Sequence, residues 1–257
     1  MNEASLFFEQ TRLVGIITLN RPARLNAISL ALQCEMLAML DECERNGAVR
    51  ALVITGGPKQ FSVGADIKEL AGAESLAPFL AQGRALFHKI ESFGKPVIAA
   101  ISGPAFGGGL EMALCCDLRI ASTSAKLGLS EIKLGALPAG GGTQRLTRLV
   151  GASYAKQLIL TGNPIDAAEA YRIGLVNAVQ PAGMELDAAV EWATEIAGRA
   201  PIAVRLAKSC IDTAAQVNLE SGLNYEAQCA AYLAGTEDQK EGMRAFVEKR
   251  KPEFQGR

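Results

Sequence analysis

Apolar and polar residues follow two periods along this chain, a period of two in some segments and a helical period in others. Residues 6–10 and 14–20 alternate in polarity and are rich in β-branched side chains, so they predict a hairpin that turns at Thr11 and Arg12. Four further apolar runs, most of them bounded by glycine or proline, predict strands: 51–55, 96–100, 117–122 and 175–179. The pattern therefore predicts a sheet whose strands come from widely spaced parts of the chain.

Helical spacing of apolar residues predicts helices between these strands. The first is expected to begin after an N-cap at Ser29 and to end near Asn46. Further helices of the body are expected at 75–92, from 108, and at 144–150, 153–161 and 167–173. Beyond residue 186 no strand is predicted, and helices are expected near 186–199, 201–217, 219–234 and 236–249. The sequence thus predicts an α/β body with an all-helical tail, but periodicity alone does not distinguish a spiral from a doubly wound sheet.

Three consecutive glycines, 107–109, stand between the strand at 96–100 and the helix that follows. Such a run costs backbone entropy that a helix start does not require, so it indicates close approach of another backbone or a ligand. The first N–H groups of a helix have no intrahelical partner and can point at a negatively charged acceptor. Gly108 and Glu111 are three residues apart and would share one side of this helix. A donor and a carboxylate in one pocket, or a tight turn with no such role, explain the stretch equally well.

Composition narrows the class of protein. The 257 residues are 49% hydrophobic and 21% charged, with a net charge of −1, which is typical of a soluble globular protein. No basic block predicts a nucleic-acid or membrane surface. Residues 1–5 do not resemble the start of a secretory signal, and no apolar run is long enough to span a membrane, so we expect neither secretion nor a membrane span. The six cysteines form no C-x-x-C pair and are expected to be mostly buried thiols in a reducing cytoplasm, with no metal site.

Several common catalytic devices are missing from the sequence. The only histidine, His88, lies in mid-helix, and no G-x-S-x-G motif accompanies it, so a nucleophilic triad is not expected. Neither a Walker-type phosphate loop nor the G-x-G-x-x-G fingerprint occurs. What remains is two glycine-marked loops and two glutamates, Glu111 and Glu131, in apolar surroundings. This set suits a carbonyl substrate that develops enolate charge, although Glu131 taken alone fits a solvated loop residue equally.

Four separate segments carry a resemblance to the enoyl-CoA hydratase/isomerase (crotonase) superfamily. The segments are 98–111 (IAAISGPAFGGGLE), 64–70 (GADIKEL), 130–146 with its Ser-Glu-Ile and PAGGGTQRL motifs, and 241–250 (EGMRAFVEKR). They match in order and spacing over essentially the whole chain. The resemblance implies that the backbone N–H groups of Ala65 and Gly108 form an oxyanion hole for the thioester oxygen. It also implies that Glu111 activates the water that adds to the β carbon, and that Glu131 protonates the α carbon.

The resemblance also implies a substrate and an assembly. The substrate would be an acyl-CoA thioester, with CoA as part of the substrate and no separate cofactor. Its contacts are expected at Arg24, Ala65, Asp66, Ile67, Lys68, Gly108, Phe246 and Lys249. The expected fold is a spiral of strand-strand-helix turns over residues 1–200, followed by a helical trimerisation region at 201–257, in a homotrimer or homohexamer. Both glutamates together favour hydration of a trans-2-enoyl-CoA.

Two departures from the family pattern leave the acyl preference open. They are residues 104–106, Pro-Ala-Phe, and Ser130, where proline often precedes the glutamate. An enoyl-CoA isomerase, or a hydratase dedicated to one substrate such as a dehydroadipyl-CoA, is the first alternative. A non-catalytic or RNA-binding member is the second, because fold does not fix function. Retention of both glutamates, together with the lack of a basic stripe, argues against this second alternative.

Overall fold

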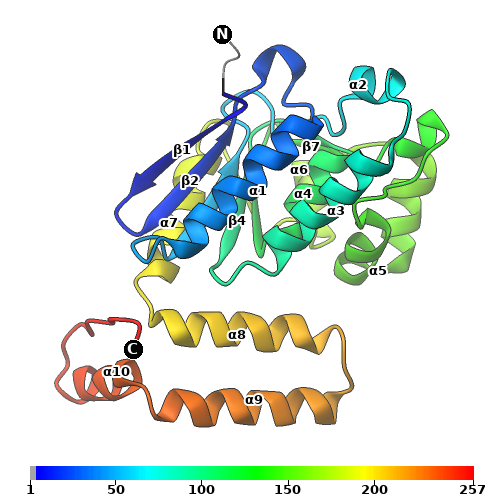
Figure 1. The fold of residues 1–257 in the computed structure, drawn as a ribbon. Coiled ribbons are helices and arrows are strands. Elements are labelled where there is room, and N and C mark those ends of the chain that lie inside the picture. The colour runs from blue at the N-terminus through cyan, green and yellow to red at the C-terminus, as the bar shows by residue number, and fades with distance from the viewer. Residues whose placement is uncertain (1–3) are drawn as a thin grey trace.

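A large, mostly parallel sheet runs through the body of the computed structural model, which describes residues 4–257 (Figure 1). Its strands are β1 (Leu6–Thr11), β2 (Val14–Leu19), β3 (Ala51–Thr55), β4 (Val97–Ile101), β6 (Leu118–Ser122) and β9 (Ala178–Gln180), and they lie in that order. Only the β1–β2 pair is antiparallel. The predicted hairpin is confirmed, and its turn falls at Arg12 and Leu13.

A second, small sheet gives the body its spiral form. It contains β5 (Pro104–Phe106), β7 (Lys126–Gly128) and β8 (Ile165–Asp166). Strands β4 and β6 of the large sheet each lead directly into a strand of the small sheet, β5 and β7. After β3, Ser62 forms an isolated parallel bridge with Ala105 and so adds a third step of the same kind. The repeated passage from one sheet to the other is the predicted strand-strand-helix spiral.

Both faces of the large sheet are buried at its central strands, because helices cover each of them there, whereas the edge strand β1 is largely exposed. Along β3, Ala51 and Val53 point to α7 (Glu185–Ala197), whereas Leu52 and Ile54 point to the core on the other side. That second core packs against α1 (Leu30–Arg45), α3 (Ala77–Glu91) and α4 (Gly108–Cys115). Burial on both sides explains why these strands are continuous apolar runs with no polar alternation.

The remaining body helices are α2 (Ile67–Ala71), α5 (Gly142–Thr161) and α6 (Ala167–Arg172), with short 3-10 turns at Pro22–Arg24 and Glu131–Leu134. The predicted N-cap at Ser29 is confirmed, since its side chain accepts from the Leu32 N–H, and Asp66 caps α2 in the same way by accepting from the Glu69 N–H. The predicted break inside α5 is also present, because Gly151 has a φ of +80°. The strand predicted at 175–179 is wrong by three residues. Leu175 and Val176 are buried in the preceding turn, so their apolar character reflects packing and not strand geometry.

The C-terminal helices α8 (Pro201–Ala214), α9 (Leu219–Ala234) and α10 (Glu237–Val247) form a separate layer beside the body (Figure 1). Helices α8 and α9 are antiparallel, and α10 packs at the far end of α9. Among residues 4–257, no helix combines the length and the apolar character needed to cross a lipid bilayer. The tail is therefore an all-helical element, as the spacing predicted.

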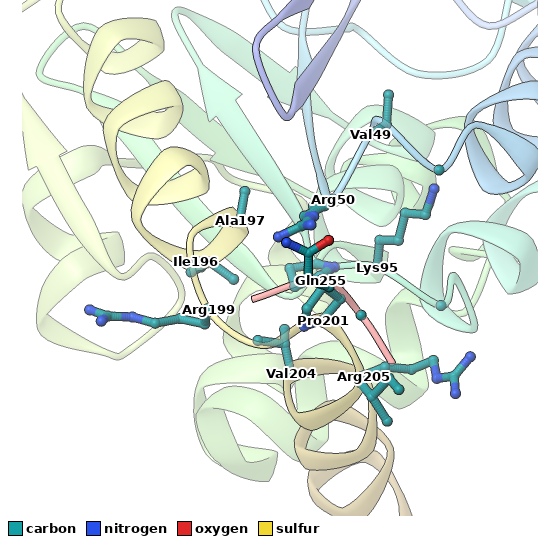
Figure 2. A pocket seen from close by; sticks show the side chains of 15 residues that line it. Val49, Arg50, Lys95, Ile196, Ala197, Arg199, Pro201, Val204, Arg205 and Gln255 are labelled. Atoms are coloured by element: carbon teal, nitrogen blue, oxygen red, sulfur yellow. The ribbon is translucent and has the colours of Figure 1, made fainter. Parts of the chain in front are cut away.

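A cavity of about 330 Å³ marks the joint between tail and body (Figure 2). Two of its cations already bind backbone oxygens. Arg50 donates to the Phe254 carbonyl at 3.0 Å, and Lys95 donates to the carbonyls of Cys43 and Asn46 at the end of α1. Among the described residues, no Asp or Glu lines this cavity. It therefore serves as a structural joint and offers no acid/base pair.

Candidate active site

A mostly apolar cavity of about 390 Å³ lies among α1, α2, α3 and the start of α4. Leucine and phenylalanine side chains of α2, α3 and the loop after Glu131 supply most of its walls. Its polar side chains are few: Gln33, Arg84, Glu111, Ser130 and Glu131. An apolar cavity with a small number of convergent polar groups is the usual form of a small-molecule site. The predicted residues Ala65 and Gly108 also line it.

The backbone of Ala65 presents its N–H to this cavity. Ile28 and Ala65 form an isolated parallel β-bridge. In it, the Ile28 N–H donates to the Gly64 carbonyl at 2.7 Å, and the Ile28 carbonyl accepts from the Asp66 N–H at 2.9 Å. These two bonds flank Ala65, so its own N–H points to the opposite side. Among residues 4–257, no protein acceptor is found for it. The Ala65 N–H is therefore free to bind a ligand oxygen.

A second free donor lies beside it at the start of α4. Gly108 is the first residue of that helix, and its N–H has no acceptor within residues 4–257. The loop of Gly64 approaches so closely that a Cβ atom on Gly64 would lie 2.9 Å from the Gly108 nitrogen. A Cβ on Gly108 would in turn lie 3.7 Å from the Ala65 nitrogen. Two unpaired N–H groups thus converge on one point, as an oxyanion site requires.

Glu111 lies one turn into α4 and is buried among apolar groups. Its Oε1 accepts a hydrogen bond of 2.8 Å from the Gly142 N–H at the start of α5. Burial raises the pKa of this carboxyl to about 7; the Gly142 bond opposes that rise, and nearby Glu131 adds to it. The prediction that Gly108 and Glu111 share one side of the helix is confirmed, because both line the cavity.

Glu131 faces Glu111 across the glycine loop. A Cβ on Gly107 would lie 3.0 Å from its Oε1, and its Oε2 is buried with no hydrogen-bond partner among residues 4–257. Burial also raises the pKa of this carboxyl. The alternative of a solvated loop glutamate is therefore wrong. A buried, unpaired carboxylate oxygen is costly, and such groups gather where a ligand or a proton is handled.

The loop residues predicted to contact CoA differ in position. Ile67 lines the cavity, whereas Lys68 and Arg24 are exposed outside its lining. Asp66 is buried and forms an ion pair of 3.0 Å with Arg21 while it caps α2. Its visible task is to hold the loop that presents the Ala65 N–H. The CoA contacts predicted for these residues stay predictions.

The two predicted tail residues lie away from the cavity in this chain. Phe246 is 85% exposed on α10, and Lys249 follows that helix in an exposed turn with a φ of +54°. Helix α10 lies at the end of the molecule farthest from α2 (Figure 1). Neither residue lines the cavity that holds Glu111 and Glu131. A contact with the same chain's substrate would need a large movement of the tail.

A support for Glu111 was missed in the sequence reasoning. Arg145 of α5 donates to the Gly140 carbonyl at 2.7 Å and forms a two-bond ion pair with Glu91, at 2.8 and 2.7 Å. Arg145 thereby holds the loop whose Gly142 N–H binds Glu111. The sequence feature that could have revealed this support is the PAGGGTQRL motif, which contains Gly140, Gly142 and Arg145.

Comparison with known proteins agrees with this geometry. The family described as Enoyl-CoA hydratase/isomerase matches residues 9–257. The short-chain-enoyl-CoA hydratase of Clostridium acetobutylicum is 43% identical over 252 residues, 97% of each chain. The 2,3-dehydroadipyl-CoA hydratase of Escherichia coli is 39% identical over 99% of this chain and 100% of its own length. The crystal structure of an enoyl-CoA hydratase from Bacillus anthracis, 42% identical, matches with a TM-score of 0.96 over 99% of this chain and 100% of that chain.

Fold, motifs and relatives agree over nearly the full length. The spiral, the paired N–H donors and the two glutamates occur together in one cavity. The similarity is well above the level at which only a fold is shared. The chain therefore belongs to the enoyl-CoA hydratase/isomerase family.

Proposed function

We propose that this protein is an enoyl-CoA hydratase that adds water across the double bond of a trans-2-enoyl-CoA thioester. The observation that carries the proposal is the presence of two carboxyls, the buried Glu111 and the half-buried Glu131, in one cavity with two free N–H donors. The full-length relatives named as hydratases support the same reaction. CoA enters as part of the substrate, and we propose no separate cofactor.

The proposed mechanism divides the work between the two carboxyls. Glu111, as carboxylate, takes a proton from water while the hydroxyl oxygen bonds to the β carbon. The electrons of the double bond move toward the thioester oxygen, where the Ala65 and Gly108 N–H groups stabilise the enolate charge. Protonated Glu131 then delivers a proton to the α carbon. Burial raises the pKa of Glu131 and so favours its protonated form relative to an ordinary glutamate, and a pKa of about 7 makes Glu111 a base of suitable strength.

Two alternatives remain within the family. An isomerase needs one group to shuttle a proton between carbons, so the second buried carboxyl would have no task. A hydratase for a dicarboxylyl substrate, such as the Escherichia coli relative's dehydroadipyl-CoA, keeps the same chemistry and differs only in the acyl end. Activity measured on a panel of enoyl-CoA substrates distinguishes the general hydratase, the isomerase and the dicarboxylyl-specific hydratase.

The test is turnover of crotonyl-CoA, followed by the loss of conjugated-thioester absorbance. Glu111→Gln and Glu131→Gln should each reduce kcat by about two to four orders of magnitude, with nearly unchanged thioester binding. Near-normal turnover in either variant would remove that residue from the mechanism. No hydration by the wild-type enzyme, but movement of a 3,4 double bond, would establish the isomerase instead.

We further propose that the tail forms a homotrimer or homohexamer and contacts CoA in a partner subunit. Phe246 and Lys249 are exposed and lie away from their own chain's cavity, and a partner's cavity is the one they can reach. Residues 201–257 would then act as the trimerisation region. A cytoplasmic location fits the six cysteines, all of them free thiols.

A further inference from the structure

Gln33 is a polar side chain in the wall of the cavity that is left without a partner. It lies on α1 and is only 1% exposed, yet within residues 4–257 its Oε1 has no hydrogen-bond partner. A buried amide oxygen left unpaired costs free energy, whereas a Leu or Met side chain would fill the same place at no such cost. Because Gln33 lines the same cavity as the two glutamates, a ligand group can supply the missing bond.

The position of Gln33 relative to the carboxyls follows from helix α3. The Gln33 amide lies against Gly83, where a Cβ would come within 3.2 Å of its Nε2. Phe87, one turn further along α3, packs against Gly140 beside Glu111. Four residues of helix correspond to about 6 Å, which separates the part of α3 beside the Gln33 amide from the part beside Glu111. Because Gln33 is buried, its amide lies at the inner end of the cavity, away from the solvent-exposed opening where the polar CoA chain would enter.

We propose that Gln33 selects acyl chains that carry a hydroxyl group a few carbons beyond the double bond. This inference rests on the proposed hydratase function and adds its substrate class. A hydroxyl donates to Oε1 and can accept from Nε2, so both partners are satisfied. An apolar acyl end leaves Oε1 unpaired. A terminal carboxylate offers Oε1 no donor and brings a second buried negative charge toward Glu111 and Glu131.

The test compares kcat/KM for trans-2-hexenoyl-CoA and for its ω-hydroxy analogue. Since leaving one buried hydrogen-bonding group unpaired commonly changes an equilibrium about tenfold or more, the wild-type enzyme should prefer the hydroxylated substrate by about tenfold. Gln33→Leu should abolish or invert this preference. Gly83→Ala should also weaken it, because the added methyl group displaces the amide while helix α3 tolerates alanine well.

Crotonyl-CoA serves as the internal control, because its acyl chain is too short to reach Gln33. The wild type and both variants should hydrate it at similar rates, and Gln33→Leu should melt no lower than the wild type, because leucine leaves no buried amide oxygen unpaired. Normal hydration of crotonyl-CoA with no preference for the hydroxylated chain, or the same preference in Gln33→Leu, overturns the inference and leaves the proposed function intact. A higher kcat/KM for the dicarboxylyl thioester than for the hydroxy analogue also overturns it. Failure to hydrate any enoyl-CoA refutes the proposed function itself.

Discussion

The three adjacent glycines before and within α4 are present for three different physical reasons. Gly107 has a φ of +49°, a conformation that L side chains rarely adopt. At Gly109, a Cβ would collide with the Ser62 carbonyl, so this position needs glycine for close backbone approach. Gly108 has ordinary room, since the nearest atom to a Cβ would be Ile28 Cδ1 at 3.5 Å. Close packing therefore explains why glycine occupies position 109. It does not explain glycine at position 108, where the proposed role is donation of the backbone N–H to the thioester oxygen.

This difference predicts opposite phenotypes for two alanine variants. Gly108→Ala should fold and melt like the wild type, but its methyl group would point at the Ala65 N–H and obstruct the thioester oxygen. Both N–H groups are kept, but the blocked contact should lower kcat/KM by about 10² to 10³, as the loss of one oxyanion contact does. Gly109→Ala should instead lower the melting temperature or fail to fold. Thermal melting and crotonyl-CoA turnover check both; a fully active Gly108→Ala would show that the thioester oxygen does not lie beside the Ala65 N–H.

Burial of Glu111 also predicts a pH-dependent change in stability. Its pKa is raised from 4.5 to about 7 in the folded state, so the folded protein binds this proton more tightly than the unfolded chain. The free energy of unfolding should therefore fall as the pH rises from about 4.5 to about 7 and stay lowered above that. Each pKa unit corresponds to about 1.4 kcal/mol, which places the cost of ionised Glu111 at about 3 kcal/mol.

Glu111→Gln removes this cost, and the variant should unfold at higher denaturant concentration than the wild type at pH 8. The gain should remain below about 3 kcal/mol, because the amide loses the charge-assisted bond from the Gly142 N–H. Below pH 4.5 the advantage should vanish, since Glu111 is then protonated in both states. Equal stability of the two proteins at pH 8 would show that Glu111 is less buried than the structure indicates.

At the scale of elements, the loop before α5 works as a support for α4. Arg145 joins this loop to α3 through Glu91, and the loop in turn binds Glu111 through Gly142. We expect Arg145→Met to reduce kcat/KM at least tenfold. The acid limb of its pH profile should move to higher pH, because the Arg145 charge and the loop N–H groups both lower the pKa of Glu111.

Arg148→Met is the matched control, because Arg148 lies one turn along the same helix, is exposed, and within residues 4–257 bonds only to Gln144. Its pH profile should coincide with that of the wild type. A uniform loss of rate in Arg145→Met, with no movement of the acid limb, would indicate a general structural role and not a positioning role for Glu111.

The sequence predicted long, strongly periodic elements well and short ones poorly. The hairpin, the N-cap at Ser29 and the break at Gly151 follow from local rules that involve few residues. Strands β5, β7 and β8 are two or three residues long, and their pairing is set by contacts between distant segments. The same limit applies to the site. Local spacing placed Gly108 and Glu111 together, but only the fold brings Gln33 to the same cavity and the Gly142 N–H to Glu111.

At the scale of the whole molecule, the tail is joined to the body by polar contacts. Lys208 pairs with Asp117 and donates to the Glu91 carbonyl at 3.1 Å. The C-terminal segment is held from both sides, since Asp238 accepts from the Gln255 N–H and Arg50 donates to the Phe254 carbonyl. Large apolar side chains stay exposed on the tail, Leu219 at 78% and Phe246 at 85% among them. Exposed apolar area of this kind supports the interface between subunits that we propose.

If that interface delivers α10 to a partner's cavity, activity should be restored between two defective chains. Phe246→Ala should raise KM for crotonyl-CoA several-fold with little change in kcat, because it removes only thioester contact. Glu111→Gln should be nearly inactive. After the two are unfolded together and refolded, some sites will combine an intact Glu111 from one chain with an intact Phe246 from the other. Those sites should combine the wild-type KM with substantial turnover, a combination that neither variant shows alone. A mixture whose KM equals that of Phe246→Ala would mean that Phe246 does not act across the interface between subunits.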